Sequence, residues 1–365
     1  MIYADHAATT PLCEAAWEAM VPFLRQEFGN PSSLHAFARR PREAVREARQ
    51  TIAACLNAAP EEIFFTSGGT EADNWVIRGA EGTLGVSAYE HHAVLNAAMA
   101  EADRGRECIL IRPHRDGTVM PDRLSALRDG PGLISVMTAN NELGVLNPIA
   151  ELCGCAHRKG FLFHTDAVQA VGHVRLDVRE TDVDFLSASA HKFNGPKGIG
   201  FLYARRGTRL VTLLHGGQQE QGRRAGTENV AAIVGMAAAL KWNCERLEEH
   251  TAKLCELGRR LEDGITGLFP DAQVLGVESP RLPGLAAVSL PGHPAEELLH
   301  LLDLKGIAVS SGAACDSRRT QVSHVLKAIR LPARLARCTL RFSLGVENTH
   351  EEVNRIVDAL RSLTS

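Results

Sequence analysis

The chain has 365 residues, of which 45% are hydrophobic and 23% are charged, values typical of a globular protein. The formal net charge is −3, so no basic surface predicts nucleic-acid binding. No apolar run approaches the roughly 18 residues that could cross a membrane. The N-terminal stretch "MIYADHAATTPL" lacks the basic and apolar regions of a signal peptide. We expect the nine scattered cysteines to be reduced thiols in a cytoplasmic protein.

Short apolar runs in the first two thirds of the chain predict buried strands, and helical patterns lie between most of them. The seven runs are 62–66, 84–88, 108–112, 133–138, 161–165, 184–189 and 200–204. In one intervening stretch, 41–56, apolar residues recur every three or four positions, which predicts a helix. Strands separated by helices predict an α/β fold with a mostly parallel seven-stranded sheet that helices cover.

The last third of the chain changes character. A long helical segment is expected from about Val230 to Leu268, with an interruption near His250. Shorter strand and helix patterns follow it, which predicts a smaller α+β domain. The expected strands are 284–290, 307–311 and 338–344, and the expected helices are 295–306, about 321–330 and 349–363. We expect a large domain over 13–248, and a small domain made of 1–12 and 249–365.

The stretch "SASAHKFNGPKGIG" (187–200) places Lys192 just after a buried strand. A solvated surface lysine is the ordinary interpretation. The alternative is a lysine that forms an imine with a carbonyl cofactor, and the choice depends on which other groups gather at the same edge of the sheet.

Other polar groups also follow predicted strands. "FFTSGGTEADN" reads as strand, glycine turn and helix, so Gly68, Gly69 and Thr70 lie where free backbone N–H groups favour a phosphate. A tight turn with Thr70 as the helix cap is an equal alternative.

Three further strand ends contribute an acid, two amides and an imidazole. Asp166 and Gln169 follow one strand, Asn141 follows another and His91 follows a third. A carboxylate can pair with a protonated pyridine nitrogen, and a flat imidazole can stack on an aromatic ring. Each has a structural alternative, a helix cap for Asp166 and a structural histidine for His91. At the carboxyl ends of parallel strands these groups meet, and together they are the set that pyridoxal 5′-phosphate (PLP) requires.

The motifs "DHAATTP", "TSGGTEADN", "NNELG", "TDAVQ", "HKFNGPKGIG", "RAGTEN", "SSGAACD" and "RFSLG" resemble, in order, those of group I cysteine desulfurases. These are class-V aminotransferase-like PLP enzymes of fold type I from the iron–sulfur-assembly and nitrogen-fixation branch. The resemblance runs from Asp5 to Gly345.

The resemblance implies a role for each site residue. Lys192 would form the Schiff base, and His91 would stack on the ring. Asp166 would bind the pyridine nitrogen, with Gln169 and Asn141 near the phenolic oxygen. The phosphate would be held by Gly69, Thr70, Ser189, His191 and, from the other subunit of a homodimer, Thr227.

Two residues select the reaction. Cys315 lies in "IAVSSGAACDSRR", a Ser/Gly/Ala loop whose arginines would lower the pKa of a thiol. The alternative is an inert cysteine in the hydrophobic core. A loop of small and charged residues does not suit a hydrophobic core, so this alternative is disfavoured. Arg341 alternates with apolar residues in "CTLRFSL", where a buried arginine must be paired. The resemblance implies that Arg341 binds the substrate α-carboxylate and that Cys315 takes the sulfur as a persulfide.

The sequence therefore predicts an L-cysteine desulfurase, with L-cysteine as substrate, L-alanine as product and a sulfur-acceptor or scaffold protein as partner. A selenocysteine lyase, another class-V PLP transferase and a non-enzymatic sulfur carrier are the alternatives. No metal site is expected: Cys153, Cys155 and His157 could suggest one, but Cys153 belongs to an apolar helical stripe that Cys155 does not share.

The chain departs from the family pattern in four places. Gln218 replaces a glycine and Gln221 an arginine, and Asp316 follows Cys315 where a hydroxyl residue is common. Only 24 residues follow Arg341, whereas relatives that hand sulfur to a scaffold carry a longer tail. These departures leave the identity of the acceptor and the preference between cysteine and selenocysteine open.

Overall fold

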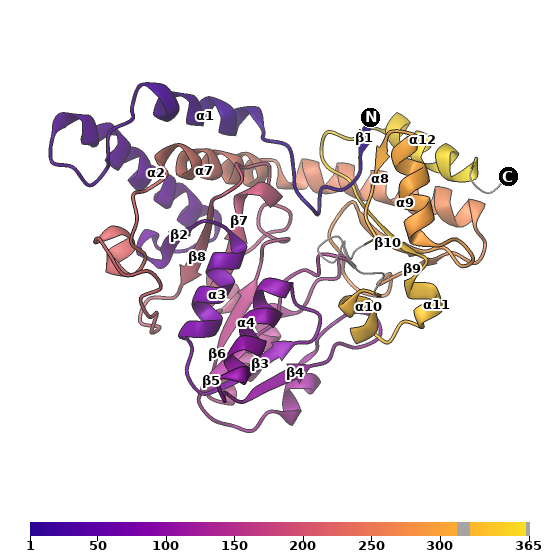
Figure 1. Cartoon of the computed structure of the whole chain (residues 1–365), viewed down its shortest axis with the longest axis horizontal. Coiled ribbons are helices and arrows are strands. Elements are labelled where there is room, and N and C mark those ends of the chain that lie inside the picture. Colours follow the sequence, from indigo (N-terminus) through magenta and orange to yellow (C-terminus); the bar gives the residue numbers. More distant parts are fainter. Residues whose placement is uncertain (312–321, 363–365) are drawn as a thin grey trace.

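The computed structural model describes residues 1–311 and 322–362. Its largest sheet has seven strands in the order β2-β8-β7-β6-β5-β3-β4 (Figure 1). The strands are β2 (Ile63–Thr66), β3 (Thr83–Ser87), β4 (Cys108–Ile111), β5 (Gly132–Ser135), β6 (Phe161–Asp166), β7 (Phe185–Ser189) and β8 (Gly200–Ala204). Strand β8 is antiparallel to both of its neighbours, and the other pairs are parallel. The predicted α/β fold with a mostly parallel seven-stranded sheet is confirmed.

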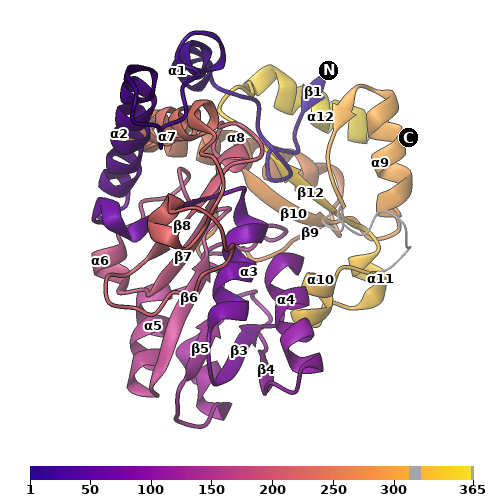
Figure 2. The same cartoon turned by 60° about the vertical axis from the view of Figure 1, so that its left-hand side comes forward.

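Helices cover both faces of this sheet (Figure 2). One layer contains α2 (Arg39–Cys55), α5 (Ile149–Arg158) and α7 (Val230–Glu245), and the other contains α3 (Gly69–Gly79) and α4 (His92–Asp103). Side chains of β2 alternate between the hydrophobic clusters of the two layers, as the pleat of a strand requires. The sheet is therefore buried on both faces, and its polar groups gather where the strands end.

A second, smaller group of strands lies beside this sheet. Strand β10 (Leu285–Ser289) pairs antiparallel with β9 (Gln273–Val274) and β12 (Thr339–Ser343), and β1 (Ile2–Tyr3) pairs in parallel with β11 (Ile307–Ala308). The remaining α-helices are α1 (Glu14–Arg25), α6 (Val178–Thr181), α8 (Leu247–Leu268), α9 (Ala295–Leu304), α10 (His324–Ala328), α11 (Ala333–Ala336) and α12 (His350–Arg361). The first strand, β1, and the last helix, α12, both lie on this side of the molecule (Figure 1).

The first residues of the chain belong to the C-terminal core. Ile2 and Ala4 are buried in a hydrophobic cluster whose other members lie between Leu254 and Leu360. The segment that follows, Asp5–Ala8, therefore starts from the small group of strands and runs to the edge of the large sheet.

One predicted boundary was wrong. The long helical segment breaks at Arg246, between α7 and α8, and not near His250. Arg246 has φ −116° and ψ 16°, which no α-helix accommodates. His250 lies inside α8, where its buried ring packs against Trp242 with 4.7 Å between centroids. Within the residues that the structure describes, no helix is long and apolar enough to span a membrane.

Candidate active site

A cavity of about 600 Å³ lies at the carboxyl ends of β6 and β7, a size typical of small-molecule sites. Nine of the ten residues expected to hold the cofactor line it, and so does Arg341. The nine are Gly69, Thr70, His91, Asn141, Asp166, Gln169, Ser189, His191 and Lys192. Residues from five separate strand ends and helix starts are thus brought to one place.

One corner of the cavity is the start of α3. Gly68 is the N-cap residue with φ +152°, a conformation that favours glycine. A Cβ atom on Gly69 would come within 2.6 Å of the Val168 side chain. Thr70 is the second residue of the helix, so the alternative in which it caps the helix was wrong. Backbone N–H groups at such a helix start suit a phosphate.

Asp166 is the last residue of β6. Its Oδ1 atom accepts a hydrogen bond from the Val168 backbone N–H at 2.9 Å. Burial raises the pKa of this carboxyl to about 6, while the Val168 hydrogen bond and the Lys192 charge oppose the rise. A buried carboxylate of this kind needs a cationic partner, and a protonated ring nitrogen would provide one.

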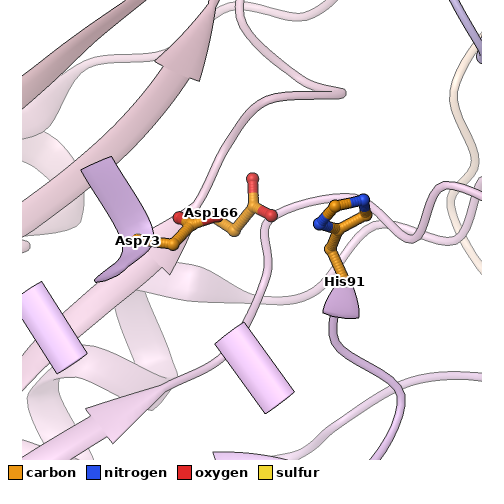
Figure 3. A group of neighbouring side chains, drawn as sticks. All are labelled: Asp73, His91 and Asp166. Atoms are coloured by element: carbon orange, nitrogen blue, oxygen red, sulfur yellow. The ribbon is translucent and has the colours of Figure 1, made fainter. Parts of the chain in front are cut away.

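Asp73 lies behind Asp166, on α3 (Figure 3). Ligand atoms of Asp73, His91 and Asp166 all lie within 4.8 Å of one another. Burial and the neighbouring Asp166 charge raise the pKa of Asp73 well above its ordinary value. Because burial disfavours the charged form that a metal needs, we interpret Asp73 as a support for Asp166. Sequence reasoning did not single out Asp73, although it lies in the quoted "TSGGTEADN" motif.

His91 caps α4 and faces Asp166 across the cavity (Figure 3). Its Nδ1 atom accepts a hydrogen bond from the Ala93 backbone N–H at 3.1 Å, which leaves the ring proton on Nε2. Burial, and then the Lys192 charge, lower the pKa of His91 to about 4. The imidazole is therefore neutral near pH 7 and able to stack on a ring. The adjacent His92 packs instead against His324, with 4.5 Å between centroids.

Lys192 closes the short 3₁₀ helix Ala190–Lys192 that follows β7. Its amine donates to the backbone oxygens of Ala7 at 2.6 Å and Ala8 at 2.9 Å. Gln169 also donates to the Ala7 oxygen, at 2.9 Å. The N-terminal segment thus forms one wall of the site, a role that the sequence analysis did not assign to it.

His191 lies beside Lys192 and is half-buried. Its Nδ1 atom is 3.2 Å from the Thr9 hydroxyl. Burial, and then the charges of Lys192 and Lys197, lower the pKa of His191 to about 4. A bound phosphate would oppose that effect, because an anion favours the protonated imidazole.

Arg341 lies in the middle of β12 and is only 4% exposed. Its Nη2 atom donates to Asp5 at 2.6 Å, and its Nη1 atom donates to the Asn141 backbone oxygen at 2.9 Å. Within the protein this buried arginine is thus paired with Asp5, while its expected pairing with a substrate carboxylate stays a prediction. Its partner, Asp5, was not predicted.

Two expected residues lie elsewhere. Thr227 is exposed and lines a neighbouring cavity of about 200 Å³, which shares Ser67 and Gly198 with the first. Cys315 lies outside the described residues, as do Asp316 and the neighbouring arginines.

The segments that lead to and from the cysteine loop are attached near the cavity. Ser310 forms two backbone hydrogen bonds with Arg341, of 2.6 and 3.1 Å. On the other side, the Ser323 hydroxyl donates to Glu142 at 2.6 Å.

The cysteines of α5 behave as the apolar stripe predicts. Ile149, Leu152, Cys153 and Ala156 are its buried residues, and Cys155 is not among them. Burial raises the pKa of the Cys153 thiol to about 12. Cys153 is therefore a packed thiol and a poor metal ligand.

The residues present fit PLP. An anion-binding helix start, a buried carboxyl, a neutral imidazole and a lysine amine face one cavity of suitable volume. Arg341 lines the same cavity, and its buried Nε atom has no hydrogen-bond partner within the described part of the chain, so the guanidinium keeps N–H groups that no protein acceptor uses.

Comparisons with known proteins agree with this description. A profile of the family described as aminotransferase class-V matches residues 2–356. Cysteine desulfurase IscS of Dictyoglomus turgidum is 45% identical over 99% of this chain and 94% of its own length. Cysteine desulfurase NifS of Azotobacter vinelandii is 41% identical over 98% and 90%.

Solved structures give the same result. A NifS-like protein superposes with a TM-score of 0.93 at 33% identity, over 100% of this chain and 99% of its own. The structure of SspA in complex with cysteine superposes with a TM-score of 0.85 at 32% identity, over 96% of this chain and 100% of its own. The chain therefore belongs to the class-V aminotransferase family, within its branch of PLP-dependent cysteine desulfurases.

Proposed function

We propose that this enzyme removes the sulfur atom of L-cysteine, releases L-alanine and holds the sulfur as a persulfide on Cys315 before an acceptor protein takes it. The observation that carries the proposal is the convergence of Lys192, Asp166, His91 and Arg341 on one cavity. A protein that only carried sulfur would have no use for this set together.

The cofactor would be held from three sides. Lys192 would hold it covalently, and Asp166 would bind its ring nitrogen. His91 would stack on the ring, and Gln169 and Asn141 would lie near the phenolic oxygen. The start of α3 at Gly69 and Thr70, with Ser189 and His191, would bind the phosphate, as the location of all four in the same cavity supports.

The substrate would be bound through its carboxylate by Arg341, whose Nε–H is unpaired within the described residues. When bound, PLP supplies an electron-accepting ring that stabilises negative charge at Cα. The Lys192 amine would remove the Cα proton and hold it for return, since it lies at the same cavity wall. His91, neutral at pH 7, would relay protons from its Nε2 side.

Cys315 would perform the sulfur transfer. Its thiolate sulfur forms a bond with the substrate sulfur, and the carbon–sulfur bond breaks. The electron pair of that bond stays with the carbon fragment, which takes up a proton and leaves as L-alanine. The backbone hydrogen bonds between Ser310 and Arg341 support this role, because the last described residues before the cysteine loop are attached beside the proposed carboxylate site.

The protein would work as a homodimer. Large apolar side chains are exposed in the N-terminal 37 residues, which supports an interface there. They include Trp17, Leu24, Phe28, Leu34 and Phe37, exposed by 50, 54, 72, 98 and 68%. Thr227, also exposed, would reach the phosphate of the other subunit.

Domain organisation and location complete the proposal. We place the domain boundary as the sequence suggested, with 13–248 as the large domain and 1–12 with 249–365 as the small one. The hydrophobic cluster that unites Ile2 and Ala4 with the C-terminal residues supports it. The eight cysteines in the described part of the chain are free thiols, which supports a reducing compartment such as the cytoplasm.

The test is a sulfur-transfer assay with the PLP-loaded protein. Wild type mixed with L-cysteine and no reductant should gain the mass of one sulfur on the peptide that contains Cys315. Cys315→Ser should still bind cysteine and change the cofactor spectrum, yet release no sulfide, because the covalent nucleophile is gone. Lys192→Ala should neither show this change in the cofactor spectrum nor release sulfide. Cys255→Ser, which removes an exposed thiol, should behave as wild type. Sulfide release from cysteine by Cys315→Ser at the wild-type rate would show that the proposed mechanism is wrong.

A further inference from the structure

The guanidinium of Arg341 is held on two of its three nitrogens. Nη2 donates to Asp5 Oδ1 at 2.6 Å, and Nη1 donates to the backbone oxygen of Asn141 at 2.9 Å. The third nitrogen, Nε, is buried and has no hydrogen-bond partner in the described residues. A guanidinium has five N–H donors, so three remain beyond these two hydrogen bonds, and since Arg341 lines the cavity they can serve a ligand.

Asp5 itself is fixed by its backbone. It forms a bridge to Ser343, two residues after Arg341 on β12. On either side of Asp5, Ser343 N–H donates to the Ala4 oxygen at 2.8 Å, and the His6 N–H donates to the Ser343 oxygen at 3.0 Å. The Asp5 side chain, 18% exposed, is therefore presented to Arg341 from an extra strand alongside β12.

A charge this deeply buried requires a counter-charge. The Asn141 carbonyl supplies only a dipole, so Asp5 is the anionic partner that the structure shows for Arg341. Without it, the guanidinium would gain freedom to turn toward other oxygens, and its remaining N–H groups would no longer be held in one orientation.

We propose that Asp5 is a positioning residue for the substrate: it fixes the guanidinium of Arg341 so that its remaining N–H groups meet the α-carboxylate of the amino acid. The inference rests on the proposed role of Arg341. Asp5 does not touch the reacting atoms, so its removal affects binding of the carboxylate and leaves the later chemical steps intact.

The experiment measures binding of L-alanine, the product with the same carboxylate, to the PLP-loaded protein by calorimetry. Asp5→Ala is expected to weaken binding about tenfold, the effect of one charge-assisted hydrogen bond. It is also expected to raise KM for L-cysteine by a similar factor, with kcat unchanged at saturation. Asp5→Glu, which keeps the charge, is expected to restore most of the affinity.

Tyr3→Phe is the matched control. It removes the hydrogen bond from the Tyr3 hydroxyl to the Thr9 oxygen, at 2.9 Å, in the same N-terminal segment, and is expected to bind L-alanine as wild type does. If it weakened binding as much as Asp5→Ala, loosening of the segment would explain both results and the inference would be wrong. Should Asp5→Ala not fold, Asp5→Asn takes its place, with weaker binding expected since the charge is lost.

Two results separate this inference from the proposed function. If Arg341→Lys binds L-alanine as tightly as wild type, the carboxylate role of Arg341 fails and the inference fails with it. If Arg341→Lys weakens binding but the Asp5 variants bind as wild type does, or more tightly, the inference alone is overturned, because Asp5 is then neutral or a competitor of the carboxylate.

Discussion

The segment that carries Thr227 is anchored by Glu220, and this anchor gives a quantitative prediction. The Glu220 carboxylate accepts hydrogen bonds from Arg49 Nη1 at 2.8 Å, from Arg49 Nη2 at 2.7 Å and from the Phe65 backbone N–H at 2.9 Å. The Glu220 side chain is 3% exposed and that of Arg49 is 19% exposed. This ion pair connects α2, the start of the large sheet and the loop before Thr227.

Glu220→Gln is expected to destabilise the protein strongly, because it leaves Arg49 buried without a counter-charge. Breaking a buried ion pair by removing one partner costs about 3–5 kcal/mol of unfolding free energy. Because Arg49 is partly exposed, we expect a loss at the lower end of this range, about 3 kcal/mol. For a chain of 365 residues, an unfolding entropy of about 2.1 cal/mol/K per residue converts this to a fall of about 4 °C in melting temperature.

The assay is thermal unfolding of the PLP-loaded protein at one scan rate, with Glu81→Gln as the control. Glu81 pairs with Arg209, but both side chains are about 70% exposed, at 71 and 68%, so its loss should change stability by less than about 1 kcal/mol. PLP dissociation should also be faster in Glu220→Gln than in the control, because the loop with Thr227 loses its anchor. If the two variants have the same melting temperature and lose PLP at the same rate, the buried ion pair does not hold the loop and the reasoning is wrong.

Two other predictions concern pH and assembly. Acidification from pH 7 to 5 should destabilise the protein by about 2 kcal/mol through His164 alone, since its unfolded pKa is about 6.5 and protonation is favoured in the unfolded chain below that pH. Burial between Ser135 and Ser187, each 2.9 Å from the ring, lowers the pKa of His164 to about 3 when folded, so this stability is complete above pH 6.5 and lost as pH falls. His164→Gln should reduce the accompanying fall in melting temperature by about 3 °C; an equal fall in both proteins would contradict this. Sedimentation of the wild type at micromolar concentration should show a dimer. The double variant Phe28→Ser, Phe37→Ser should dimerise more weakly. A wild-type monomer that binds PLP and consumes cysteine would refute the proposed interface.

The sequence predicted the large sheet well because its strands are buried on both faces. Such strands are continuous apolar runs, and their short length and flanking polar residues distinguish them from helices. All seven expected runs became strands, and nine of the ten expected cofactor residues share one cavity. Strand ends are local features, and parallel strands place them at the same edge, so sequence reasoning could bring these residues together.

Partners that are distant in the sequence could not be predicted in this way. Asp5 is 336 residues from Arg341, and Arg49 is 171 residues from Glu220. With 43 acidic residues in the chain, no local pattern indicates which of them a given arginine will meet. The predicted position of the helix break, near His250 and not at Arg246, differs from the structure for a related reason. The ring of His250 is buried by packing, whereas the sequence shows only a polar residue.

The N-terminal segment is where the predicted and the unpredicted parts of the site meet. The oxygens of Ala7 and Ala8 accept hydrogen bonds from Lys192, on the side where the cofactor residues follow β7. Two residues earlier, Asp5 binds Arg341 on β12, the residue proposed to bind the α-carboxylate. Three of the four residues Asp5–Ala8 thus contact the groups proposed to move the Cα proton and to bind the α-carboxylate. Because Asp5–Ala8 is held along β12 by Ser343, the distance between those two groups is set by the small group of strands, which fixes the substrate relative to the large sheet.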